Sequence, residues 1–121
     1  MKLLVREPET AALAELLTDR NASLTTSAIA VVEVLRAVRI AEPGPAGALR
    51  VRRRLDETVL VDVTRELLDD AASYTSARVR ALDAIHLASA LRVGASEMLV
   101  YDRRLAEAAE AAGLEVLSPG A

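Results

Sequence analysis

Three carboxylates in this chain stand against apolar surroundings. Glu33 lies inside the apolar run 28–35, Asp83 stands at the front of the apolar stretch 82–91, and Asp102 directly follows an apolar tetrapeptide. A buried carboxylate without a partner is costly, and an arginine, a helix cap or a divalent cation is the usual remedy. The three acids therefore indicate a candidate site for chemistry on a charged substrate.

Each acid also has a structural interpretation. Asp102 and Asp83 are both suited to cap a helix that follows them. Glu33 lies in the middle of a predicted helix, so capping cannot explain it, and an exposed pair with Arg36 is its structural alternative. His86 follows Asp83 by three residues on the same helix face, and we expect it to be a packed, hydrogen-bonded residue rather than a ligand.

The composition narrows the class of protein. A chain of 121 residues with no cysteine favours one domain over residues 1–121, without disulfides or a cysteine-based zinc site. It has no Phe or Trp, which disfavours an aromatic platform for single strands. No apolar run is long enough for a membrane span, and no signal peptide is evident, so we expect a cytoplasmic protein without membrane association.

A basic segment covers residues 50–54, although the formal net charge of the chain is −3. Helical spacing places Arg50, Arg53 and Arg54 on one face and puts Val51 and Leu55 on another. This face is either solvated, or contacts RNA phosphates, or binds a protein partner. A negative total charge does not exclude a nuclease, because an acidic site lowers the total while basic patches elsewhere hold phosphates.

Periodicity, helix caps such as Thr64 and terminators such as Gly113 predict an alternation of helices and strands. The expected helices cover about 8–20, 27–41, 65–76, 83–94 and 102–112, with a basic helix between the break at 42–45 and residue 56; the expected strands cover 22–26, 58–63, 97–101 and 114–117. Strands separated by helices imply parallel pairing and an α/β/α sandwich. In such sheets, ligands bind beyond the carboxyl ends of the strands. Asp102 lies at one of these ends, and Glu33 and Asp83 lie on helices that can face the same edge.

The segments 27–37, 82–91 and 99–106 resemble the PIN domain, in particular the VapC ribonuclease toxins of prokaryotic toxin–antitoxin systems. Glu33, Asp83 and Asp102 match the family's second, third and fourth acidic positions. The resemblance implies a three-layer α/β/α sandwich with a central parallel sheet, Mg²⁺ or Mn²⁺ bound by these acids, and endonucleolytic cleavage of RNA. It also implies a small VapB-like antitoxin that covers the active site, and we further expect a homodimer.

Two departures from the family pattern stand out. The family's first acidic residue follows a central strand, and the matching position would lie five residues before Met1. The resemblance therefore implies that the first strand and its aspartate are missing and that 1–5 is helical. A start assigned too far downstream or a truncated product would account for this; alternatively, 1–5 forms a strand and partly fills the gap. The second departure is Val100, where the family often has a hydroxyl residue.

Phosphodiester hydrolysis needs an activated water and neutralisation of phosphoryl charge, and divalent cations supply both. Mg²⁺ prefers carboxylate oxygens, which suits an all-acid site. Without the first aspartate, this chain is expected to cleave RNA weakly or not at all. Two alternatives stay open: a catalytically impaired remnant that binds an antitoxin, and a PIN-like nuclease with another nucleic-acid substrate.

Overall fold

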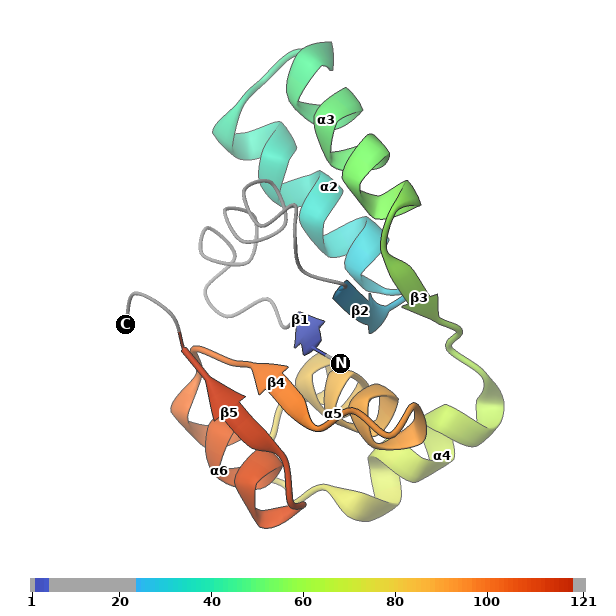
Figure 1. Ribbon diagram of the computed structural model, residues 1–121, viewed down its shortest axis with the longest axis vertical. Coiled ribbons are helices and arrows are strands. Elements are labelled where there is room, and N and C mark those ends of the chain that lie inside the picture. Colours follow the sequence, from blue (N-terminus) through green and yellow to red (C-terminus); the bar gives the residue numbers. More distant parts are fainter. Residues whose placement is uncertain (1, 5–23, 119–121) are drawn as a thin grey trace.

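The computed structural model describes residues 2–4 and 24–118, which form a parallel sheet between two helical layers (Figure 1). The strands are β1 (Lys2–Leu4), β2 (Leu24–Ser27), β3 (Val59–Val61), β4 (Glu97–Leu99) and β5 (Glu115–Leu117). The helices are α2 (Ala30–Ala41), α3 (Pro45–Asp56), α4 (Arg65–Tyr74), α5 (Ala81–Arg92) and α6 (Arg103–Ala111). This is the α/β architecture with parallel pairing that the sequence predicts. The helix expected over 8–20 lies outside the described residues.

The centre of the sheet corrects one prediction. The strand order is β3-β2-β1-β4-β5, so β1 occupies the middle. Lys2 pairs in parallel with Leu24 of β2 and with Glu97 of β4. The expectation that the central strand is missing is therefore wrong, and the alternative that 1–5 contributes a strand is confirmed for Lys2–Leu4. With β1 in place, no unpaired row of backbone groups separates β2 from β4.

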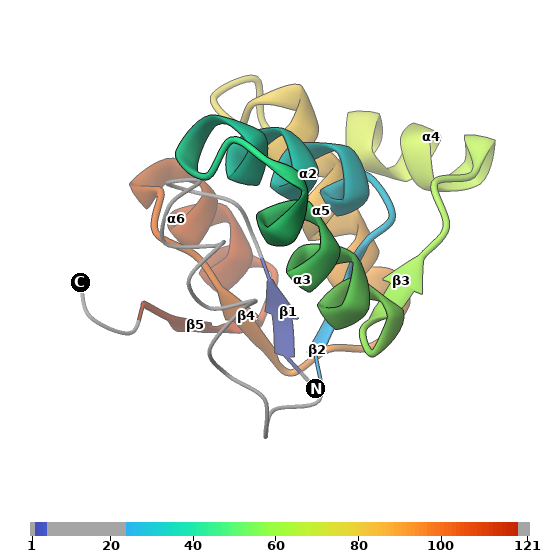
Figure 2. The ribbon, with the colours of Figure 1, turned by 90° about the horizontal axis from the view of Figure 1, so that it is seen from above.

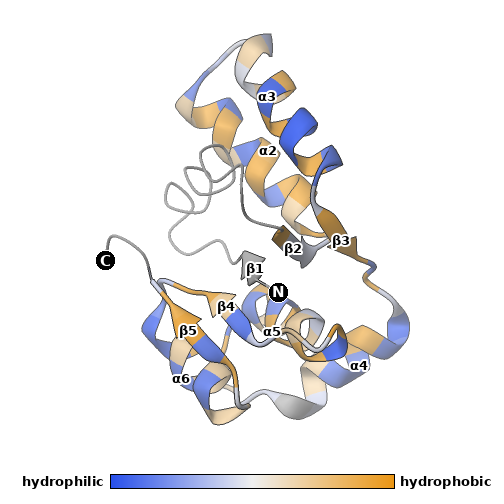
Figure 3. Ribbon diagram, viewed as in Figure 1, coloured by the Kyte–Doolittle hydropathy of each residue, from blue (hydrophilic) through white to orange (hydrophobic). Residues whose placement is uncertain are grey.

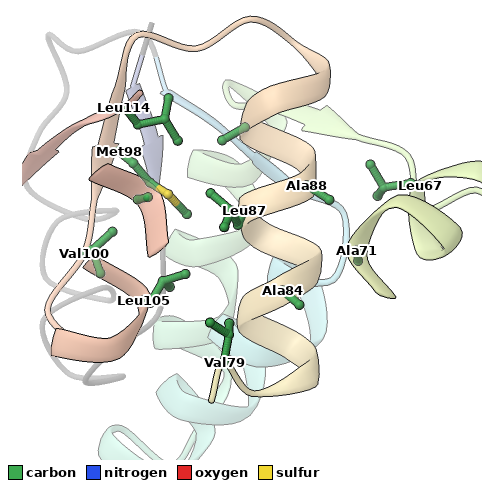
Figure 4. Packing of buried hydrophobic residues seen from close by; sticks show 12 residues of the cluster. Leu67, Ala71, Val79, Ala84, Leu87, Ala88, Met98, Val100, Leu105 and Leu114 are labelled. Carbon is green, nitrogen blue, oxygen red and sulfur yellow. The ribbon is translucent and has the colours of Figure 1, made fainter. Parts of the chain in front are cut away.

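Two apolar cores hold the layers together. On one side, α2 and α3 pack on the sheet; on the other side lie α4, α5 and α6 (Figure 2). The apolar run through β4 serves both cores, because Met98 and Val100 belong to the cluster under α5 and α6 while Leu99 belongs to the cluster under α2. Figure 4 shows Leu87 and Leu105 reaching toward Met98 in the larger cluster. An interior strand covered on both faces requires such continuous apolar sequence.

Local signals fixed several helix ends. Thr64 caps α4 by accepting a hydrogen bond from the Leu67 amide, as expected. Pro45, which was expected to end the break at 42–45, occupies the first turn of α3. Asp102 caps α6, and Gly113 follows that helix with a φ of 94°. The cap predicted at Asp83 is wrong, because α5 begins at Ala81 and Arg80 is its N-cap residue.

The topology sends several helix starts to one edge of the sheet. Both α2 and α6 follow a strand directly, so their first turns lie at the carboxyl ends of β2 and β4. Helix α5 leads into the amino end of β4, so its first turn points back toward the same carboxyl edge. Within the described residues, no helix is long and apolar enough to cross a membrane.

Candidate functional site

Glu33 is held on the side of α2 that borders its buried face. It lies in the first turn of the helix, next to the buried Val34, and its side chain is only 9% exposed. The Glu33 carboxylate is therefore almost completely buried among apolar residues, where it requires a hydrogen-bonding partner.

That partner comes from the opposite helical layer. Nε2 of His86 on α5 lies 2.7 Å from Oε1 of Glu33. A carboxylate oxygen only accepts, so the imidazole N–H is the donor. His86 is buried and hydrogen-bonded, as the sequence predicts, and Glu33 does not form the alternative pair with Arg36. The contact joins residues 53 positions apart, and it was missed because no local pattern reveals such a pair.

Asp83 lies one turn before His86 on the same face of α5 and is 3% exposed. Because α5 begins at Ala81, Asp83 occupies the third helical position and not the cap. A negative charge in the first turn of a helix is favoured by the amide dipoles. This explains why the helix tolerates a buried acid there, but it does not require one.

Asp102 follows β4 and keeps its structural role. Its Oδ2 accepts a hydrogen bond from the Leu105 amide at 3.3 Å, which caps α6. The side chain is partly exposed, unlike that of Asp83. Nearby, Val100 is fully buried, and the hydroxyl of Ser118 donates to its carbonyl oxygen, so a hydroxyl reaches this position from the segment after β5.

The donor types fit a hard divalent cation, but their arrangement does not. Carboxylate oxygens are the ligands that Mg²⁺ prefers. Among the residues that the structure describes, however, no three Asp, Glu, His or Cys side chains gather closely enough to hold a metal ion. Glu33 is engaged by His86, and Asp102 is engaged by the start of α6. The structure joins Glu33 to His86, which shares a face of α5 with Asp83. Asp102 lies at the same edge of the sheet, but it is bonded to the start of α6 instead.

Basic side chains project from the α2–α3 hairpin. Arg36 and Arg39 on α2 and Arg52 and Arg53 on α3 are exposed, and none forms a salt bridge with another residue that the structure describes. In Figure 3 the polar turns of α3 alternate with apolar ones along the hairpin. The predicted grouping of Arg54 with the solvated arginines is wrong, because Arg54 is 7% exposed and bonds Glu57 across one turn.

Comparison with known proteins places this chain in a family. The PIN domain model matches residues 1–111. Ribonuclease VapC35 of Mycobacterium tuberculosis is 41% identical over 126 residues, covering 99% of this chain and 91% of that protein. Two further relatives come from the same organism. Ribonuclease VapC46 is 38% identical over 98% of this chain and 91% of the relative. Ribonuclease VapC47 is 35% identical over 99% of this chain and 91% of the relative. No solved structure matches significantly. The family match over most of the chain, together with relatives above 30% identity along nearly all of it, shows that this chain belongs to the PIN-domain family.

Proposed function

We propose that this chain is an endoribonuclease toxin of a VapBC-type toxin–antitoxin system, with Glu33, Asp83 and Asp102 as its catalytic acids. The observation that supports it best is the arrangement of helix starts. The first turns of α2 and α5 and the N-cap of α6 carry one acid each to the carboxyl edge of a parallel sheet, where α/β proteins bind ligands. The names of the related ribonucleases favour RNA as the substrate.

The proposal includes dependence on a divalent cation, Mg²⁺ or Mn²⁺. PIN-domain nucleases of the VapC type generally depend on divalent metals. Asp83, Asp102 and Glu33 are the carboxylates available to hold the ion at this edge. Because the described carboxylates do not form a metal cluster as placed, binding requires Asp102 to turn from its cap toward the other two acids.

The exposed arginines of the α2–α3 hairpin support a nucleic-acid substrate. Arg36 lies one turn beyond Glu33 on α2, and no carboxylate of residues 24–118 pairs with it. Unpaired guanidinium groups beside an acidic site can hold phosphates that the acids alone would repel. Arg50 contributes less, because it pairs with Glu42.

The remaining parts of the proposal concern organisation and partners. We infer that residues 1–121 form one PIN-like domain, since a single sheet takes strands from Lys2–Leu4 and from Glu115–Leu117. A VapB-like antitoxin is the proposed protein partner, and it would act by covering the acidic edge. The expected homodimer stays a prediction, and sedimentation velocity at micromolar concentration checks it.

A substrate panel tests the proposed activity. Purified protein is incubated with single-stranded RNA, single-stranded DNA, double-stranded DNA and a flap substrate, with Mg²⁺, Mn²⁺ or EDTA. We expect internal cleavage of RNA that EDTA abolishes. Cleavage of DNA or flap substrates in preference to RNA contradicts the proposed substrate, and cleavage that persists in EDTA contradicts the metal requirement.

A second candidate function is favoured by one observation. The described acids do not gather into a metal-binding cluster, as expected of a catalytically impaired PIN domain that serves as an antitoxin-binding module. Co-expression with a VapB-like antitoxin separates these two functions. Tight complex formation without any RNA cleavage by the freed chain supports the binding module, whereas cleavage that the antitoxin inhibits supports the toxin.

A further inference from the structure

A buried polar contact joins the two helical layers at the edge of the sheet that carries Glu33, Asp83 and Asp102. His86 on α5 and Glu33 on α2 meet at 2.7 Å, with side chains 1% and 9% exposed. Helices α2 and α5 pack on different faces of the sheet. Their contact beyond the strand ends therefore fixes one helix start against the other.

The imidazole ring makes this contact and no other hydrogen bond. Its second nitrogen, Nδ1, is buried and lacks a hydrogen-bond partner within the described residues. A buried ring nitrogen left without a partner is a cost that packing alone does not require. An aliphatic side chain would fill the same space without this cost, so the polarity of His86 serves Glu33.

A glutamate on a helix needs such a contact if its carboxylate is to stay in one place. The side chain has three rotatable bonds and loses considerable rotamer freedom when it is fixed. A short hydrogen bond to a carboxylate is stronger than one between neutral groups. Hydrogen bonds that orient site carboxylates are a general requirement of hydrolytic sites, and their loss reduces activity.

We propose that His86 is a positioning residue that orients the Glu33 carboxylate for RNA cleavage. The inference rests on the proposed function, because it assigns His86 a role through Glu33. His86 contacts neither substrate nor the reacting atoms in this account. It holds Glu33 Oε1 through Nε2–H, so the orientation of the acid depends on a residue of the opposite layer.

The test is a double-mutant cycle on steady-state cleavage of single-stranded RNA. His86→Leu removes the donor while keeping an apolar side chain in place, and His86→Gln keeps an N–H donor; both are made in the wild-type and Glu33→Gln backgrounds. We expect His86→Leu to lower kcat by about 10- to 100-fold with little change in KM. We expect His86→Gln to recover much of that loss, and His86→Leu to have no further effect on kcat once Glu33 is Gln.

Leu87→Ala serves as the control for loosening of α5. Leu87 is 3% exposed and belongs to the apolar core rather than to the site. This variant should lower the melting temperature while leaving kcat per folded molecule unchanged. If His86→Leu behaves like Leu87→Ala, or if it lowers kcat equally in both backgrounds, His86 is structural and the inference is overturned.

An NMR measurement reads the contact without relying on activity. His86 is the only histidine of the chain, so ¹⁵N-histidine labelling gives the spectrum of one ring. We expect a protected downfield Hε2 signal that moves upfield in Glu33→Gln, and the absence of that signal overturns the inference. If the unsubstituted chain does not cleave RNA, the proposed function fails together with the inference, whereas cleavage that needs Glu33 but not His86 overturns the inference alone.

Discussion

Asp102 is the acid whose structural role and proposed catalytic role can be separated most cleanly. Its Oδ2 accepts from the Leu105 amide at 3.3 Å, and Leu105 is fully buried, so the cap secures the start of α6 against the core. Asparagine caps a helix about as well as aspartate, whereas alanine does not. Asp102→Asn therefore keeps the cap and removes the charge, while Asp102→Ala removes both.

The two variants should differ in stability and agree in activity. Loss of the cap in Asp102→Ala costs about 1 kcal/mol of unfolding free energy, or about 3–5 °C in melting temperature for a chain of this size. Asp102→Asn loses only the charge–dipole term, less than about 1 kcal/mol and screened by salt. Both should reduce RNA cleavage by at least about tenfold, because a neutral side chain cannot serve as a site carboxylate.

Thr64→Ala provides the matched control, because Thr64 caps α4 through the Leu67 amide at 3.1 Å and carries no charge. It should lower stability by about as much as Asp102→Ala, about 1 kcal/mol, and leave cleavage per folded molecule unchanged. Thermal unfolding and cleavage rates of the variants are compared in one buffer. Wild-type cleavage by Asp102→Asn would refute the reasoning and leave Asp102 with its cap alone.

Three further predictions address the apolar core, RNA binding by the exposed arginines and the amino-terminal strand. Met98→Ala should lower the unfolding free energy by about 2–5 kcal/mol in denaturant titrations, because Met98 on β4 is fully buried against the helices. The control Leu82→Ala, at a residue that is 44% exposed, should change the unfolding free energy by less than about 0.5 kcal/mol. Arg52→Gln and Arg53→Gln should weaken RNA binding and each reduce the slope of log K against log salt by about 0.7, measured by fluorescence anisotropy; an unchanged slope contradicts phosphate contact. Leu3→Pro should lower the unfolding free energy, because Lys2–Leu4 pairs with both β2 and β4 and proline cannot donate to either neighbour; an unchanged unfolding free energy contradicts the central place of β1.

Features with local causes were predictable from the sequence. The caps at Thr64 and Asp102 and the left-handed Gly113 depend on a few neighbouring residues, and each lies where it was expected. The apolar run 98–100 also indicated an interior strand, because both of its faces are covered. The PIN-like architecture follows from such alternation together with the ordered motifs.

Features decided by distant contacts were not predictable in the same way. Lys2–Leu4 is too short to show a period, and pairing with β2 and β4 decides that it is a strand. Asp83 resembled a cap, but the helix begins earlier, at Ala81. The Glu33–His86 contact depends on how α2 and α5 meet at the sheet edge, which neither helix encodes alone.

The most direct test of the central claim is the rate of Mg²⁺-dependent RNA cleavage by Asp83→Asn. Asp83 is buried at the start of α5, so the unfolding curve of the Asp83→Asn variant is measured as well. Asp69→Asn, on the exposed face of α4, is the control for the same change in charge. The account predicts that Asp83→Asn stays folded and loses cleavage, while Asp69→Asn cleaves like the unsubstituted chain. A folded Asp83→Asn protein that cleaves RNA at the unsubstituted rate would contradict the assignment of this edge as the active site.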